Sequence, residues 1–292
     1  MPAISIIVPT RSRNHLLPRA VRSLLGQTFT DFEILVVDDN PPEARVFTDS
    51  VLTSLLDHPK VRVLNHDQPR NASSARNVGL RAARGEWVTY LDDDDAYQPT
   101  KLEKQLRQAQ KSSLPLGICG VTFHLARRRR RRVLAGDKVA GDELLLIHFA
   151  MPTLFHRQMP SVFFDEDLYS GEDSYYFYRL IEQSNTKQIF NVAETLVDVY
   201  PQPGLRVNTN AEGFWQASRS IYRDFASAYG PAAAEVFLAR TQLGYLKFQK
   251  RSLRPMLQPA WTLLRMRGLK EFRPILNSFL FKVPLARRFL VS

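Results

Sequence analysis

Four consecutive aspartates are the residues of this sequence best suited to carry chemistry. Asp92, Asp93, Asp94 and Asp95 directly follow an apolar segment, residues 87–91. Four like charges next to one another repel unless water or a cation neutralises them. Carboxylate oxygens are ligands that Mg²⁺ and Mn²⁺ prefer, and these ions commonly bridge one or two Asp side chains to substrate phosphates. The aspartates therefore predict a binding site for a divalent cation and a phosphate group.

Polar residues also follow two other apolar segments. Residues 4–8 and 32–37 are rich in Val and Ile and show no strict alternation, which is typical of strands buried on both faces of a parallel sheet. They are followed by Pro9-Thr10-Arg11 and by Asp38-Asp39. In open α/β sheets, ligands bind beyond the carboxyl ends of the strands. We therefore expect these residues and the four aspartates to meet at one edge of a sheet.

The order of the predicted elements supports such a sheet. Strands are predicted at residues 4–8, 32–37, 61–64 and 87–91, with helices between them at 16–25, 42–57 and 73–84. Ser73 or Ser74 is a suitable N-cap for the third helix, and Gly85 would end it. This alternation predicts an α/β fold with a doubly wound, mostly parallel sheet that is flanked by helices.

The segments after residue 98 predict further elements. Helices are expected at residues 99–111, 142–150 and 171–181, strands at 116–123 and 187–199 (one or two), and a strand or loop at 153–156. Residues 127–132 are six successive arginines. Such a run is typical of a solvated hairpin tip, but it would also suit contact with anionic lipid or a phosphorylated acceptor. The sequence leaves these interpretations open.

The positive charge is concentrated in the last part of the chain. The net charge is +11 over 292 residues, and residues 206–292 hold 15 Lys and Arg against 4 Asp and Glu, while residues 1–205 are balanced. We therefore expect two regions: a catalytic domain over residues 1–205 and a helical, basic region over residues 206–292. The basic helices would either pack on their own domain or lie on an anionic membrane surface.

Several function classes find no support in the sequence. There is no Gly-x-Gly-x-x-Gly after the first strand, no phosphate-binding Gly-x4-Gly-Lys loop and no His-Glu-x-x-His. The single Cys119 excludes an internal disulfide and a multi-cysteine metal site. The first residues lack the pattern of a signal peptide, and the apolar runs are short, so we expect a cytoplasmic protein, peripheral at most on the membrane's cytoplasmic face.

Taken together, six segments resemble glycosyltransferase family 2, which has the GT-A fold. The resemblance covers about residues 3–205. Its segments are Ser5-Ile6-Ile7-Val8-Pro9-Thr10, residues 23–28, Ile34-Leu35-Val36-Val37-Asp38-Asp39, Ala75-Arg76-Asn77-Val78-Gly79, residues 85–95 and Gly171-Glu172-Asp173. Each is weak alone, whereas six in the family's order and spacing are specific. The Asp-x-Asp of residues 92–94 is the family's metal motif.

The resemblance implies a role for each matching residue. Those expected to bind the nucleotide sugar are Pro9, Thr10, Arg11, Asp39, Arg76, Asp92 and Asp93. Asp94, together with Asp92, would bind the metal, Mn²⁺ or Mg²⁺, and Asp173 would be the general base of an inverting transfer. Family members often carry a His shortly after the last strand, but residues 200–206 contain none. A third protein ligand to the metal is therefore not expected.

These roles imply a metal-dependent, inverting glycosyltransferase. The donor would be a nucleotide sugar, most readily a UDP-sugar, and the acceptor a glycan or lipid-linked saccharide of cell-surface polysaccharide biosynthesis. Two alternatives remain: a nucleic-acid-binding protein that uses the basic region, and an inactive scaffold of the same fold. The balanced charge of residues 1–205 and the acidic run argue against nucleic acid as a partner.

Overall fold

The computed structural model describes most of the first two thirds of the chain. The described residues are 1–44, 50–66, 70–126, 128–140, 150–168, 171–186, 188–201, 222–224 and 227. The chain divides into two compact units, Met1–Phe214 and Trp215–Ser292. Almost all of the predicted basic helical region lies outside the described residues, as does most of the helix predicted at 142–150. The domain boundary near residue 205 and the role of the basic region therefore stay predictions.

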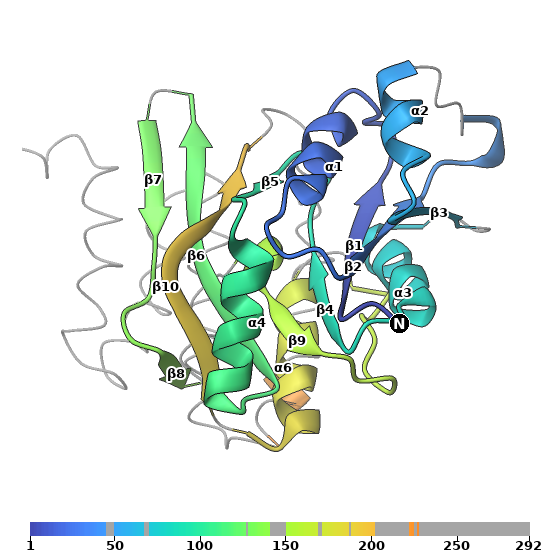
Figure 1. The fold of residues 1–292 in the computed structure, drawn as a ribbon. Coiled ribbons are helices and arrows are strands. Elements are labelled where there is room, and N and C mark those ends of the chain that lie inside the picture. The colour runs from blue at the N-terminus through green and yellow to red at the C-terminus, as the bar shows by residue number, and fades with distance from the viewer. Residues whose placement is uncertain are drawn as a thin grey trace, which may run out of the picture. The chain divides into compact units, whose positions relative to one another are not determined.

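Within the described residues, the first unit is built on a ten-stranded sheet in the order β3-β2-β1-β4-β9-β6-β10-β5, with β7 paired to β6 and β8 to β10 (Figure 1). The strands are β1 Ile4–Thr10, β2 Phe32–Asp38, β3 Val61–Asn65, β4 Trp87–Tyr90, β5 Ala96–Tyr97, β6 Leu116–Leu125, β7 Arg128–Arg132, β8 Lys138–Ala140, β9 Phe155–Arg157 and β10 Gln188–Val199. The predicted α/β sheet is confirmed, and antiparallel strands extend it.

The direction of the strands decides where their ends lie. β1 pairs in parallel with β2 and β4, and β2 pairs in parallel with β3. β9 is antiparallel to both β4 and β6, so β6 runs in the same direction as β4. The carboxyl ends of β1, β2, β3, β4 and β6 therefore lie at the same edge of the sheet, as expected for a ligand-binding edge.

Helices cover both faces of this sheet (Figure 1). They are α1 Leu17–Leu25, α2 Ser50–Leu56, α3 Ala72–Ala82, α4 Lys101–Ser112 and α6 Glu172–Ser184, with 3-10 turns η1 Pro42–Ala44 and η2 Met151–Thr153. Ile4, Ile6 and Val8 of β1 join the core that α1, α2 and α4 cover. Ile7 points to the opposite face, where α3 packs. None of the described helices is long and apolar enough to cross a bilayer.

Several predicted boundaries differ from the structure. The N-cap of α3 is Asn71 rather than Ser73 or Ser74, because the Asn71 side chain accepts from the Ser74 backbone N–H in a capping box. The helix ends at Ala82 with Ala83 as its C-cap, and Gly85 instead allows a close approach: a Cβ there would lie 2.6 Å from the backbone nitrogen of Ser5. The helix predicted at 42–57 is described as η1 and α2, with residues 45–49 outside the description.

Two later segments were also assigned only coarsely. The strand or loop predicted at 153–156 begins with η2 and becomes β9 at Phe155. The arginine run is not a hairpin tip: five of its six residues form β7, which pairs antiparallel with β6. Residues 188–199 are one strand, β10, with register shifts between Val192 and Val197.

Candidate functional site

The carboxyl ends of β1 and β4 meet through hydrogen bonds. Thr10 Oγ1 donates to Asp93 Oδ2 at 2.8 Å. Arg13 lies in the loop after β1, and its Nη1 lies 3.1 Å from Asp93 Oδ1 and 3.2 Å from Asp94 Oδ2. Its guanidinium therefore neutralises part of the acidic run. The sequence analysis did not single out Arg13, although its position, three residues after a strand end, was a usable signal.

Three aspartates of the acidic run have raised pKa values. Burial raises the pKa of Asp93 to about 6, against the opposing effects of Arg13 and the Thr10 hydroxyl. Burial and the neighbouring Asp92 also raise the pKa of Asp94, and raise that of Asp95 well above its usual value. Asp95 accepts from the Tyr200 backbone N–H at 3.0 Å and is 3% exposed, so it is tied to the strand β10 end. Further positive charge near this run would be favourable.

A single arginine joins the acidic run to the opposite side of the site. Arg76 of α3 donates through Nη2 to Asp92 Oδ1 at 2.9 Å and through Nη1 to Asp173 Oδ1 at 3.2 Å. The Arg76 side chain is 5% exposed, whereas those of Asp92 and Asp173 are 34% and 32% exposed. Burial disfavours the guanidinium charge, but Asp173, Asp92 and Glu172 outweigh this, so the pKa of Arg76 is raised. The buried guanidinium of Arg76 thus holds two carboxylates that are each about a third exposed to solvent.

Close packing of α3 on the sheet positions Arg76. Gly79 makes this packing possible, because a Cβ at that position would lie 2.5 Å from the Ile7 side chain of β1. The helix is also held by Asn77, whose amide donates to the Phe164 carbonyl at 2.9 Å and accepts from the Phe164 N–H at 2.8 Å. The Phe164 ring in turn lies 5.4 Å from the Arg76 guanidinium. Sequence spacing alone does not disclose these contacts.

Asp173 stands in the first turn of α6. Gly171 precedes the helix with φ of 79°, a left-handed conformation that glycine adopts without steric cost. Burial raises the pKa of Asp173 to about 7, Arg76 opposes this shift, and Glu172 and Asp92 add to it. A carboxyl group that titrates near neutral pH is suited to take up a proton during a reaction.

Buried hydroxyl groups fix α6 against β4. Tyr176, one turn after Asp173, places its OH 2.8 Å from the Tyr90 OH of β4. The Tyr90 OH lies 3.0 Å from His156 Nε2, while His156 Nδ1 donates to the Arg157 carbonyl at 2.7 Å. Burial lowers the pKa of His156 to about 4, so this imidazole is neutral and its Nε2 accepts. The network therefore sets the distance between Asp173 and the acidic run.

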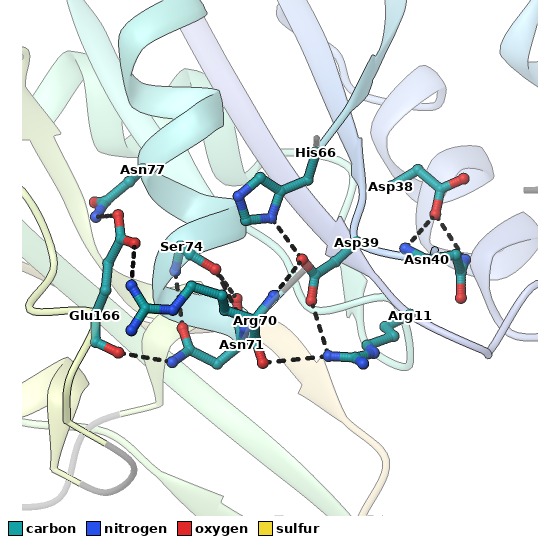
Figure 2. A network of polar contacts seen from close by, with 10 residues as sticks. All are labelled: Arg11, Asp38, Asp39, Asn40, His66, Arg70, Asn71, Ser74, Asn77 and Glu166. Carbon is teal, nitrogen blue, oxygen red and sulfur yellow. Dashed lines mark hydrogen bonds and ion pairs between the residues drawn. The ribbon is translucent and has the colours of Figure 1, made fainter. Parts of the chain in front are cut away.

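A second polar cluster surrounds Asp39 at the end of β2 (Figure 2). Asp39 Oδ1 lies 2.6 Å from His66 Nδ1 and accepts from the Arg70 N–H at 3.3 Å, while Oδ2 lies 3.4 Å from Arg11 Nη1. Asp38 is turned away, since its Oδ1 accepts from the Asn40 backbone and amide nitrogens. The sequence analysis missed His66, although it directly follows β3 and the strand-end rule would have indicated it.

The structure thus arranges the predicted residues in two clusters. Thr10, Asp92, Asp93, Asp94, Arg76 and Asp173 form one, and Arg11 and Asp39 form the other; we call them together the strand-end site. Pro9 lies in β1 directly before Thr10, beside Val37 of β2 in the strand register. Of the predicted residues, the Thr10 hydroxyl and Asp93 are engaged with each other, whereas Arg11 is half exposed.

The donor set suits a hard divalent cation. Asp92 and Asp94 offer carboxylate oxygens. Burial and, after it, the neighbouring Asp92 raise the pKa of Asp94, and a bound cation would favour its ionised form. Among the described residues, no three Asp, Glu, His or Cys side chains converge closely enough to hold a metal ion. A cation there would consequently share its coordination with substrate oxygens or water, which is usual for Mg²⁺.

Comparisons with known proteins agree with this arrangement. The model of the family described as glycosyl transferase family 2 matches residues 5–166, more than half of the chain. The GalNAc(5)-diNAcBac-PP-undecaprenol beta-1,3-glucosyltransferase of Campylobacter jejuni is 38% identical over 113 residues, which cover 38% of this chain and 36% of that protein. Matches to other curated relatives, too, cover about a third to a half of their length.

Solved structures share the fold. Staphylococcus aureus TarS 1–349 in complex with UDP-GlcNAc is similar with a TM-score of 0.70 and 19% identity, over 94% of this chain and 84% of that one. The mannosyltransferase PcManGT of Pyrobaculum calidifontis, in complex with GDP-Man and Mn²⁺, is similar with a TM-score of 0.55 and 16% identity, over 99% and 83% of the two chains. At these identities the likeness concerns the fold, and the prediction of a GT-A type sheet is confirmed.

Proposed function

Because the chain belongs to glycosyltransferase family 2, we propose that it is a metal-dependent, inverting glycosyltransferase that uses a nucleoside-diphosphate sugar, most readily a UDP-sugar. The observation that carries the proposal is the Arg76 bridge. It holds Asp173, whose pKa is raised to about 7, and Asp92 of the acidic run at opposite ends of one guanidinium. Arg76 thereby keeps Asp173, the base for the acceptor, at a fixed distance from Asp92, which would bind the donor.

The two clusters of the strand-end site divide the donor between them. Asp39, with Arg11 beside it, offers a carboxylate that would accept a hydrogen bond from the base, such as from the N3–H group of uracil, and Thr10 and Pro9 would border the ribose. The fold neighbour TarS binds UDP-GlcNAc and PcManGT binds GDP-Man, which supports a nucleotide-sugar donor without deciding the base. Arg13 and Arg76 provide positive charge for the diphosphate.

Asp92 and Asp94 would hold the divalent cation. When bound, the cation would offset the negative charge that develops on the leaving nucleoside diphosphate. PcManGT was solved with Mn²⁺, which supports this assignment by likeness of fold only. The protein's own part is to place Arg13, which is 26% exposed, 3.2 Å from the Asp94 carboxylate, where it would also be near a bound phosphate.

Asp173 would act as the general base. An acceptor hydroxyl attacks the anomeric carbon of the donor sugar and the new C–O bond forms as the bond from that carbon to the phosphate oxygen breaks. The hydroxyl proton passes to the Asp173 carboxylate, and the nucleoside diphosphate leaves with the electron pair. One displacement with one base inverts the anomeric configuration. A lipid-linked saccharide is the acceptor that we favour, because the Campylobacter jejuni relative is named for an undecaprenol-linked substrate.

Replacement of single carboxylates tests the proposal. A thermal-shift panel of nucleotide sugars with Mn²⁺ first identifies a donor that stabilises the protein. Asp173→Asn should then lower kcat for donor hydrolysis or transfer by about 10²- to 10⁴-fold, the usual share of a general base, while donor binding stays within a few-fold. Asp94→Asn should weaken Mn²⁺-dependent donor binding.

The neighbouring Glu172 provides the matched control, since it carries the same charge in the same helical turn. Glu172→Gln should keep most of the activity, because it removes a helix-terminal charge but not the base. In the wild type, kcat/KM should fall about tenfold per pH unit below the raised pKa of Asp173, near 7, because the base must be ionised. If Asp173→Asn and Asp94→Asn both retain wild-type rates, the assignment of the base and of the metal ligand is wrong. A wild type that neither binds nor turns over any nucleotide sugar would instead be an inactive scaffold.

A further inference from the structure

The strand β7 is an unusual element, because every residue in it is an arginine. Arg128–Arg132, which we call the arginine strand, pairs only with β6 among the described strands. The residues opposite it in register run from Leu125 to Val121 and include no acidic side chain. Four of the five arginines are exposed to solvent. The sixth arginine of the run, Arg127, lies outside the described residues.

Within the described part of the chain, the exposed arginines have no counter-ion. Among the residues that the structure describes, the side chains of Arg128, Arg129, Arg130 and Arg131 make no hydrogen bond or ion pair, in contrast to those of the strand-end site arginines. Arg132 differs, because it is partly buried over the Phe123 ring, and burial and Arg130 lower its pKa. Like charges at this spacing repel one another. A cluster that no described side chain neutralises is suited to a negative surface outside the protein.

The arginine strand begins at the same edge of the sheet as the strand-end site. β6 runs in the direction of β4, so its carboxyl end, at Leu125, and the start of β7 lie at that edge (Figure 1). His124 of β6 lies opposite Arg129 and places Nε2 2.6 Å from Asp198 Oδ1 of β10. Its ring also stacks on Tyr200, whose N–H binds Asp95 of the acidic run.

Exposed apolar side chains flank the arginine strand at both ends. Leu125 is 39% exposed and Val133 is 41% exposed, and they are two of four exposed large apolar side chains in the described part of the chain. Guanidinium groups with adjacent apolar side chains are typical of protein surfaces that lie at the headgroup level of a bilayer. Guanidinium also binds phosphate in a bidentate manner, as an ammonium cannot.

We propose that the arginine strand, with Leu125 and Val133, docks on an anionic lipid bilayer. The arginines bind lipid phosphates, and the two apolar side chains enter the headgroup boundary. The apolar neighbours favour a bilayer over single-stranded nucleic acid, whose bases stack on aromatic side chains. The docking itself does not depend on the proposed function. Its use does: it would hold the strand-end site against a membrane that carries a lipid-linked acceptor.

Vesicle binding by the full-length protein tests this proposal. The probes are vesicles of phosphatidylcholine alone and of phosphatidylcholine mixed with phosphatidylglycerol. Because each basic residue near an anionic surface contributes about a fivefold gain in affinity, the double variant Arg129→Gln/Arg131→Gln should bind the mixed vesicles about 25-fold more weakly. Arg129→Lys/Arg131→Lys keeps the positive charge and should recover most of the vesicle binding. Leu125→Ser should weaken the vesicle binding that remains at high salt, where charge interactions are screened.

A second pair of exposed arginines provides the control for net charge. Arg22→Gln/Arg84→Gln removes the same charge from α1 and from the turn before β4, and should change vesicle binding less than twofold if the arginine strand is the contact. Unchanged circular dichroism spectra and thermal unfolding establish that the variants fold.

The proposal is overturned if the arginine-strand pair binds vesicles like the wild type, or no worse than the control pair. If Arg129→Gln/Arg131→Gln loses binding to single-stranded nucleic acid but keeps its vesicle binding, the surface binds nucleic acid instead. Catalytic activity enters none of these readouts, so failure here leaves the proposed function standing.

Discussion

Arginines serve two regions of the described chain, the strand-end site and the strand β7, and the two groups have different surroundings. Arg11, Arg13 and Arg76 each contact a carboxylate of the acidic run, of α6 or of the β2 end. Arg128 to Arg131 of β7 contact none among the described residues. Arginine side chains therefore form ion pairs within the protein in one region and are exposed to an external partner in the other.

The difference separates two uses of positive charge. In the strand-end site, arginines keep carboxylates at set positions, and Arg76 does so from an almost fully buried place. In β7, the like charges repel one another, and no described carboxylate offsets this repulsion. Removing an arginine should accordingly harm stability and chemistry at the site, but should leave the fold untouched in β7.

The largest effect is expected at Arg76. Arg76→Gln leaves Asp92 and Asp173 facing each other without the guanidinium, and breaking a buried pair of this kind costs about 3 to 5 kcal/mol. Since both carboxylates are about a third exposed, solvent screening should reduce the loss to roughly 2 kcal/mol. Urea unfolding measures it, with Arg130→Gln as the matched control. Equal midpoints for the two variants would show that the bridge contributes no stability.

An intermediate effect is expected at Arg13. Its guanidinium competes with a cation for Asp94, so Arg13→Gln should tighten Mn²⁺ binding in the absence of nucleotide by about fivefold, the equivalent of about 1 kcal/mol for one partly exposed ion pair. Electron paramagnetic resonance of free Mn²⁺ measures the affinity without any catalytic assay. Asp94→Asn in the same background should abolish the gain. Weaker Mn²⁺ binding in Arg13→Gln would mean that Arg13 orders the aspartates rather than competing for them.

The strands and the edge at which they end could be predicted from the sequence. Runs such as residues 4–8 are apolar without alternation, and this pattern indicates a strand covered on both faces whatever the details of packing. That rule also placed Thr10, Asp39 and the acidic run at one edge. Applied to β3, it would have added His66.

The contacts that organise the site could not be predicted in this way. Arg76 reaches Asp173, 97 residues away, only because Gly79 brings α3 close to β1. Arg13 lies in a loop with no periodic pattern, so nothing in the sequence indicated which carboxylate it would contact. The strand β7 could not be predicted either. Consecutive arginines show no pattern typical of a strand, and this strand forms through its pairing with β6. Tertiary contacts decided each of these.

The smallest effect, and the sharpest contrast with Arg76, is expected for stability in β7. Arg129→Gln/Arg131→Gln removes two exposed charges that no described carboxylate balances, so no ion pair with a described residue is lost and some repulsion is relieved. The melting temperature should stay within about 2 °C of the wild type, or rise slightly, when scanned at low salt. Added salt should reduce any rise, because it screens the repulsion in the wild type. A clear fall in melting temperature would mean that these arginines have carboxylate partners within the protein, and the contrast between the two regions would then disappear.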